Sequence, residues 1–140
     1  MSSQTTAVKQ AVIERAKGLC EYCQSPADYS PQPFSIEHIL PISAGGGSEL
    51  ANLAYACQGC NNHKYTKTSG FDPLTNSIVA LFHPRRDIWR NHFGWGDGGL
   101  EIIGLTPTGR ATVQELQLNR KNLVNLRALL LLADLHPPGE

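Results

Sequence analysis

The chain has 140 residues, which is enough for one domain with a modest core and too few for two independent ones, so we expect a single domain over residues 1–140. Its hydrophobic fraction of 41% and charged fraction of 17% are ordinary for a globular protein and argue against disorder. No apolar run approaches the ~20 residues of a membrane span, and residues 1–9 lack the apolar centre of a secretion signal. We therefore expect a cytoplasmic protein with no membrane partner.

The formal net charge is zero, which by itself argues against a nucleic-acid partner. The charge is unevenly distributed, however, because residues 63–90 carry five basic groups against two acidic ones. A local basic face can contact phosphates although the whole molecule is neutral. A solvated surface explains each basic residue at least as well when it is taken alone. The candidates for contacts to a phosphate backbone are Lys64, Lys67, Arg85 and Arg86.

The elements of the first 41 residues are predicted from hydrophobic periodicity and from the glycines and prolines that end helices and strands. Apolar residues between Thr6 and Lys17 recur at three- and four-residue steps, and Gly18 supplies a stop, which predicts a helix. Residues 24–33 contain three prolines and predict a loop. Residues 34–40 alternate between apolar and polar side chains, which predicts a short strand that ends at Pro41.

The next stretch completes a small unit of two strands and a helix. A glycine-rich turn is expected over residues 44–48, and residues 50–55 are expected to return beside the first strand. A short helix is predicted from Asn61 to about Lys67, with Ser69-Gly70 ending it.

The second half of the chain is predicted to contain a strand, a helical turn or two, a loop, a hairpin and a final helix. Asn119 is expected to cap that helix, which is apolar over more than one face. It is therefore either deeply buried or partly a homodimer contact. The predicted ranges are a strand over 77–82, helical turns over 87–93, a loop over 94–99, a hairpin of 100–105 with 110–118, and a helix over 119–135.

All four cysteines fall in two Cys-x-x-Cys pairs, Cys20/Cys23 and Cys57/Cys60, with 33 residues between the pairs. In a reducing compartment such pairs are more often metal ligands than disulfides. Two pairs supply the four thiolates of a closed, tetrahedral structural zinc site, whose binding energy is folding energy. Redox thiols, disulfides and another metal are the alternatives.

The same stretch also holds Glu37-His38, then Asn52, and then Asn61 directly after the second cysteine pair. A lone Glu-His pair at a strand end is usually a solvated surface feature. The ordered combination resembles the HNH endonuclease family, in which an acidic-His pair lies on the first strand, an Asn in the returning segment, and a His or Asn after the second cysteine pair. The resemblance covers about residues 20–67. It implies a ββα-metal finger with its core at about residues 18–68.

The resulting prediction is an α+β fold in which this finger, stabilised by structural zinc, has an N-terminal helix and a C-terminal extension of β-hairpin plus helix over about residues 71–136. The extension also resembles that of small bacterial HNH proteins, cyanobacterial ones among them, and the resemblance does not imply its function. The residues that carry it include Phe71-Asp72-Pro73 and Leu81-Phe82-His83-Pro84-Arg85-Arg86.

The resemblance implies a metal-dependent endonuclease that hydrolyses DNA phosphodiester bonds with a single divalent ion, Mg²⁺ or Mn²⁺. His38 would be the general base, since an imidazole exchanges a proton near neutral pH. Glu37 and Asn61 would hold the ion, and Asn52 would order the loop that presents His38. His63 is the alternative ligand to Asn61, because side chains two positions apart on a helix do not share a face.

Two other functions stay open. A non-catalytic, zinc-stabilised module that binds nucleic acid or protein fits the zero net charge and the missing third histidine of the pattern. A nuclease directed at RNA is the weaker alternative.

Overall fold

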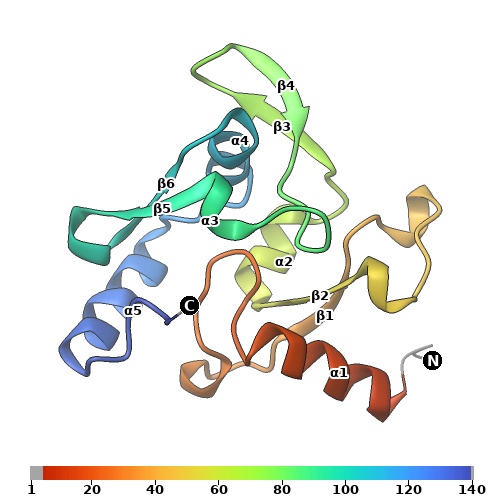
Figure 1. Ribbon diagram of the computed structural model, residues 1–140, viewed down its shortest axis with the longest axis horizontal. Coiled ribbons are helices and arrows are strands. Elements are labelled where there is room, and N and C mark those ends of the chain that lie inside the picture. The colour runs from red at the N-terminus through yellow and green to blue at the C-terminus, as the bar shows by residue number, and fades with distance from the viewer. Residues whose placement is uncertain (1–4, 140) are drawn as a thin grey trace. The chain divides into compact units, whose positions relative to one another are not determined.

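Residues 5–139 are described by the computed structural model, whose helices and strands are labelled in Figure 1. The chain divides into two compact units. Unit 1 comprises the chain up to Thr68 together with His83–Arg86, and unit 2 comprises Ser69–Phe82 together with the chain from Asp87 onward. None of the helices among residues 5–139 has both the length and the apolar character that crossing a membrane requires.

Unit 1 begins with α1 (Thr6–Ala16), which confirms the first predicted helix. Thr5 caps its start, because the side-chain oxygen accepts a hydrogen bond from Val8 N at 3.1 Å. The helix ends where Lys17 adopts a left-handed backbone conformation with φ of 57°. Its buried residues pack in one cluster with residues of β2, and the cluster comprises Val12, Ala16, Leu53 and Tyr55.

The predicted pair of strands is confirmed as an antiparallel hairpin of β1 (Ser35–His38) and β2 (Leu53–Ala56). Glu37 pairs with Ala54, and His38 pairs with Leu53. Because successive residues of a strand point to opposite faces, His38 shares a face with Ile36, which packs against the α1 cluster. Glu37 points to the other face, where α2 lies. Unit 1 thus places the two residues of the Glu-His pair on opposite sides of the hairpin.

The third element of the finger, α2 (Gln58–Lys64), starts three residues earlier than predicted. The reason is that Cys57 itself caps the helix, with its sulfur accepting a hydrogen bond from Cys60 N at 3.4 Å. Asn61 therefore lies in the middle of the helix and not at its start. The helix also ends earlier than predicted, because Tyr65 has a positive φ of 51°.

Unit 2 contains two further antiparallel hairpins and three helices. The hairpins are β3 (Ser69–Asp72) with β4 (Ser77–Ala80), and β5 (Phe93–Gly96) with β6 (Glu101–Gly104). The helices are α3 (Trp89–His92), α4 (Pro107–Glu115) and α5 (Lys121–Leu132). Short 3₁₀ turns elsewhere in the chain are Ala27–Tyr29, Ile42–Ala44, Leu50–Asn52 and Asp97–Gly99. The predicted α+β class is confirmed.

Part of the prediction for unit 2 is wrong. Residues 110–118 were expected to be a strand but lie mostly in α4, because Thr106 accepts a hydrogen bond from Gly109 N at 2.9 Å and Pro107 suits the first helical turn. The partner of β6 is instead β5, in a stretch expected to be loop. Gly94 and Gly96 of β5 pair with Ile103 and Glu101 of β6.

The final helix is present, but Asn119 does not cap it. The Asn119 side chain accepts from Ile102 N at 2.7 Å and donates to Ile102 O at 2.9 Å, while Arg120 is the N-cap residue and makes no side-chain capping bond. One face of α5 is buried through Leu123 and Leu130, whereas Leu129 is 65% exposed. A homodimer contact through the exposed face stays a prediction.

Candidate metal centre and active site

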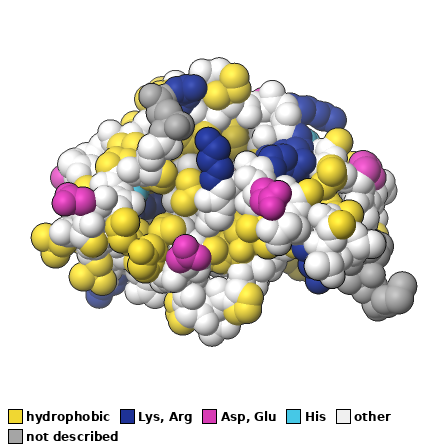
Figure 2. Space-filling model, turned by 60° about the horizontal axis from the view of Figure 1, so that its bottom comes forward, with side chains coloured by type: hydrophobic (Ala, Val, Ile, Leu, Met, Phe, Trp, Pro, Cys, Tyr) yellow, Lys and Arg dark blue, Asp and Glu magenta, His cyan; other side chains and the backbone are white. Residues whose placement is uncertain are grey.

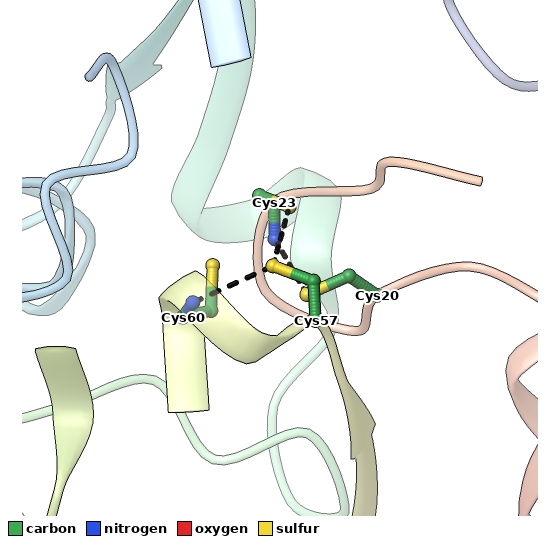
Figure 3. A group of neighbouring side chains, drawn as sticks. All are labelled: Cys20, Cys23, Cys57 and Cys60. Atoms are coloured by element: carbon green, nitrogen blue, oxygen red, sulfur yellow. Dashed lines mark hydrogen bonds between the residues drawn. The ribbon is translucent and has the colours of Figure 1, made fainter. Parts of the chain in front are cut away.

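The four cysteine side chains converge in unit 1, two from the loop after α1 and two from the start of α2 (Figure 3). All four residues are buried, none forms a disulfide, and the sulfur atoms lie within 4.8 Å of one another. The sulfurs of Cys23 and Cys57 are 3.7 Å apart. Zinc–sulfur bonds of ~2.3 Å in a tetrahedron place neighbouring sulfurs about 3.8 Å apart, so the spacing suits a zinc ion.

The surroundings of the Cys57 sulfur favour a thiolate, whereas burial raises the pKa of the Cys20 thiol. Each Cys-x-x-Cys pair makes the same bond, from the amide of its second cysteine to the sulfur of its first, at 3.4 Å in both pairs. Hydrogen bonds from Cys20, Cys23 and Cys60 lower the pKa of the Cys57 thiol. Metal binding requires deprotonated sulfur. Within residues 5–139, this is the one group of three or more His, Cys, Asp or Glu side chains close enough to share an ion.

The backbone that follows His38 is held by Asn52. Its Oδ1 accepts a hydrogen bond from Leu40 N at 2.8 Å, and its Nδ2 donates to Leu40 O at 3.0 Å. The same Nδ2 donates to Gly47 O at 2.8 Å, and Ile39 N donates to the Asn52 carbonyl at 2.9 Å. Asn52 therefore joins the end of β1 to the glycine-rich turn.

The imidazole of His38 is half-buried and touches that turn directly. Its Nε2 lies 2.9 Å from the hydroxyl oxygen of Ser48. This contact orients the ring, because a hydrogen bond at one ring nitrogen defines where the other nitrogen points.

Glu37, one residue before His38, lies in the interior and is only 5% exposed. Its Oε1 accepts a hydrogen bond from the hydroxyl of Tyr22 at 2.6 Å, and its Oε2 lies 2.7 Å from the ammonium nitrogen of Lys64. Burial, and then the charge and hydrogen bond of Glu37, raise the pKa of Tyr22 well above its ordinary value, which keeps the phenol a donor. Both carboxylate oxygens are therefore engaged by protein groups.

This environment does not fit the predicted role of Glu37 as a ligand of the catalytic ion. Mg²⁺ keeps several waters and must reach the substrate phosphate, which requires an accessible carboxylate. Lys64 does not fit its predicted phosphate contact either, because it is 1% exposed and its ammonium donates to Ile39 O at 2.9 Å. The sequence suggested a surface cation, whereas the fold places this lysine inside.

The two alternative ligands on α2 lie in different surroundings. Asn61 shares the inner face of the helix with Lys64, three residues away, and its amide nitrogen is 3.5 Å from the hydroxyl of Ser35. His63 is half-buried, and its carbonyl accepts a hydrogen bond from Lys67 at 3.2 Å.

The remaining basic candidates also differ from one another. Lys67 and Arg86 are exposed, as a phosphate contact requires. Arg85 is half-buried and pairs with the carboxylate of Glu21, so its positive charge is partly neutralised inside unit 1. Figure 2 shows basic and acidic side chains interspersed with hydrophobic ones on the face that it draws.

A family model described as HNH endonuclease matches residues 20–67, the stretch that holds the cysteine cluster, β1, β2 and α2. Residues 20–67 form an HNH endonuclease domain. This HNH domain coincides with the range expected from the sequence, which confirms the predicted resemblance.

A second comparison agrees with the HNH assignment. The chain is 28% identical over 67 residues to the Type IV methyl-directed restriction enzyme EcoKMcrA of Escherichia coli (strain K12). The match covers 44% of this chain and 24% of the relative, so the chain spans about a quarter of that enzyme's length. Both comparisons support a nuclease-type function for the HNH domain.

Two residues of the HNH domain site escaped the sequence analysis. Tyr22 lies between the first two cysteines, and Ser48 ends the glycine-rich turn. Their partners, Glu37 and His38, are 15 and 10 residues away along the chain. An aromatic residue inside a cysteine pair and a serine beside glycines carry no signal of these contacts until the hairpin is formed.

Proposed function

We propose that the HNH domain is a metal-dependent endonuclease that hydrolyses DNA phosphodiester bonds and leaves 5′-phosphate and 3′-hydroxyl ends. The observation that carries the proposal is the setting of His38: a half-buried imidazole at a strand end, oriented by Ser48 and followed by backbone that Asn52 clamps. The family match supports the same reading. The proposed setting is the cytoplasm, where cysteines stay reduced and available to zinc.

In this proposal His38 accepts a proton from the water that attacks the phosphorus atom. Ser48 and Asn52 keep the imidazole and its loop in one arrangement, so that little reorganisation is needed when the substrate is bound. A divalent ion, Mg²⁺ or Mn²⁺, would neutralise the negative charge of the scissile phosphate. Among the predicted ligands, Asn61 is the one proposed to hold it, with His63 as the alternative, since Glu37 is occupied by Tyr22 and Lys64.

Two exposed cations of unit 1 are proposed to contact the DNA backbone. Lys67 and Arg86 meet the requirement for phosphate contacts, which position DNA without reading its sequence. With few such contacts and zero net charge, we expect weak binding that falls only gradually as salt rises, because the salt dependence grows with the number of phosphates neutralised.

The decisive experiment is plasmid nicking. Purified protein and His38→Ala are incubated with supercoiled plasmid in Mg²⁺, in Mn²⁺ and in EDTA, with zinc content and circular dichroism measured for both proteins. We expect ion-dependent nicking by the parent chain and its loss in the variant at unchanged zinc content. Equal nicking by the two proteins would contradict the proposal, because His38 would then not be needed for cleavage.

The competing function is a zinc-stabilised module that binds DNA without cutting it. The burial of Glu37 beneath Lys64 favours it, because the carboxylate expected at the catalytic ion is withdrawn from solvent. Binding of a labelled DNA duplex by both proteins, without nicking by either, would decide for this module.

A further inference from the structure

Three buried polar side chains in unit 1 meet although they belong to different segments. Tyr22 comes from the first cysteine pair, Glu37 from β1 and Lys64 from α2. Tyr22 is fully buried, and Glu37 and Lys64 are 5% and 1% exposed. A lysine this deeply buried is rare unless it is paired, and here the partner carboxylate lies 2.7 Å away.

The ammonium of Lys64 takes the place that a cation would occupy at this carboxylate. Glu37 Oε2 makes no hydrogen bond of good geometry, so Lys64 holds this oxygen through charge. A divalent ion at the same oxygen would stand beside a buried positive charge, and like charges repel strongly where solvent is excluded. The pair is electrically complete without an added ion.

The same lysine reaches past His38. Its ammonium donates a hydrogen bond to Ile39 O at 2.9 Å while it pairs with Glu37. Lys64 therefore binds the residue before His38 and the residue after it. Tyr22 restrains the other oxygen of Glu37 at 2.6 Å, so the carboxylate cannot rotate away from the lysine without losing a bond.

We propose that Tyr22, Glu37 and Lys64 form a positioning network that fixes the backbone on both sides of His38, with Lys64 serving as the permanent counter-ion of Glu37. The expected effect on cleavage rests on the proposed nuclease function. The expected effects on the stability of the protein and on the His38 imidazole do not depend on cleavage. In this proposal Glu37 positions His38 and is not a ligand of the divalent ion.

The test is a charge-pair cycle in the full chain, with Glu37→Gln, Lys64→Met and the double variant. Each single change leaves a buried charge without its partner, which is more disruptive than removal of both charges. We expect each single variant to melt at a lower temperature and to nick plasmid slower by on the order of 10²-fold, the usual effect of a misplaced catalytic group. The double variant should recover most of both losses.

Two further readouts separate positioning from ion binding. The ¹H–¹⁵N signals of the His38 imidazole should shift in both single variants and return toward the parent positions in the double variant. The Mg²⁺ concentration for half-maximal nicking should be the same in the double variant as in the parent. Lys67→Met, an exposed lysine three residues after Lys64, is the matched control and should leave melting temperature and imidazole signals unchanged.

The outcomes are distinct. A double variant that is as stable as the parent but does not nick, or that needs far more Mg²⁺, would make Glu37 an ion ligand and overturn the proposal. Imidazole signals that stay in place in the single variants would also overturn it. If the parent chain does not nick plasmid at all, the nuclease proposal fails alone, and the melting temperatures and imidazole signals still decide the network.

Discussion

Ser48 lies with its hydroxyl oxygen 2.9 Å from Nε2 of His38, so a residue of the glycine-rich turn touches the proposed base. Ser48→Ala should slow nicking by roughly tenfold, a fraction of the 10²–10⁴-fold that a positioned acid or base contributes. Stability should change little, since a half-exposed hydrogen bond contributes about 1 kcal/mol net. Initial nicking rates and thermal melting measure the two effects. Unchanged rates would mean that Ser48 does not orient the ring.

The loop beside His38 leaves no room for a side chain at Gly46. A Cβ there would overlap the carbonyl oxygen of Leu40, which the Asn52 clamp also uses. Gly46→Ala should therefore break the clamp and destabilise unit 1 by about 1–3 kcal/mol, the cost of unpairing buried polar groups. Denaturant unfolding measures the change in the free energy of unfolding.

The neighbouring glycine supplies the control for that variant. A Cβ on Gly47 would meet only the side chain of Glu49, which is flexible and exposed. Gly47→Ala should be close to the parent in stability. A Gly46→Ala protein as stable as Gly47→Ala would show that the loop adapts and that the clamp is not rigid.

The cysteine cluster should make the fold of unit 1 depend on zinc. Elemental analysis should find about one zinc per chain, because four thiolates complete its coordination. Removal of the ion by a strong chelator, or Cys57→Ser, should unfold the HNH domain, since the binding energy of a structural zinc is folding energy. Circular dichroism and zinc content measure this. A Cys57→Ser protein that folds normally would contradict the structural role.

Asn61 and His63 should differ in their effect on cleavage. Asn61 lies on the inner face of α2, so Asn61→Ala should reduce ion-dependent nicking and raise the Mg²⁺ concentration needed for it. His63→Ala should have the smaller effect. Titrations of nicking against Mg²⁺ compare the two variants, and loss of activity in His63→Ala alone would reverse the assignment.

Unit 2 should lose stability in acid through a single ion pair. Arg110 donates two hydrogen bonds to Asp72, from Nε to Oδ1 at 2.9 Å and from Nη2 to Oδ2 at 3.1 Å, and these hold the pKa of Asp72 well below its ordinary value. The unfolded chain takes up this proton at a higher pH, about 3.9, so acid favours unfolding. The stabilisation is present above that value and is lost as pH falls through the folded pKa.

Urea unfolding at a series of pH values from about 6 down to about 2 measures this loss. Asp72→Asn is the control, because it removes the titrating group and should flatten the dependence that this carboxylate contributes. An equally steep dependence in Asp72→Asn would place the acid sensitivity in another carboxylate.

Local signals in the sequence were sufficient for much of unit 1. The helical period before Lys17, the alternation around Ile36 and the two cysteine pairs each predicted an element that the structure contains. The start of α2 was missed because its cap is a cysteine sulfur, a role that is invisible when the same residue is counted only as a metal ligand.

Unit 2 was harder to predict because its local signals are ambiguous. Thr106-Pro107 suits a turn and equally suits the start of a helix, and the choice follows from the bond between Thr106 and Gly109 N. The glycines before Asp97 suggested a loop, yet Gly94 and Gly96 lie in β5 and pair with Ile103 and Glu101 of β6. For β5, pairing with β6 outweighs the local preference for a loop.

The sequence by itself determined the four-cysteine cluster, the HNH pattern and the identity of His38 as the candidate base, because these depend on residue type and spacing. Only the tertiary structure decided what the charged residues around His38 do. Glu37 and Lys64 each look like surface groups along the chain, 27 positions apart, and become a buried pair when α2 packs under β1. Burial and partnership depend on three-dimensional packing, which spacing alone does not encode.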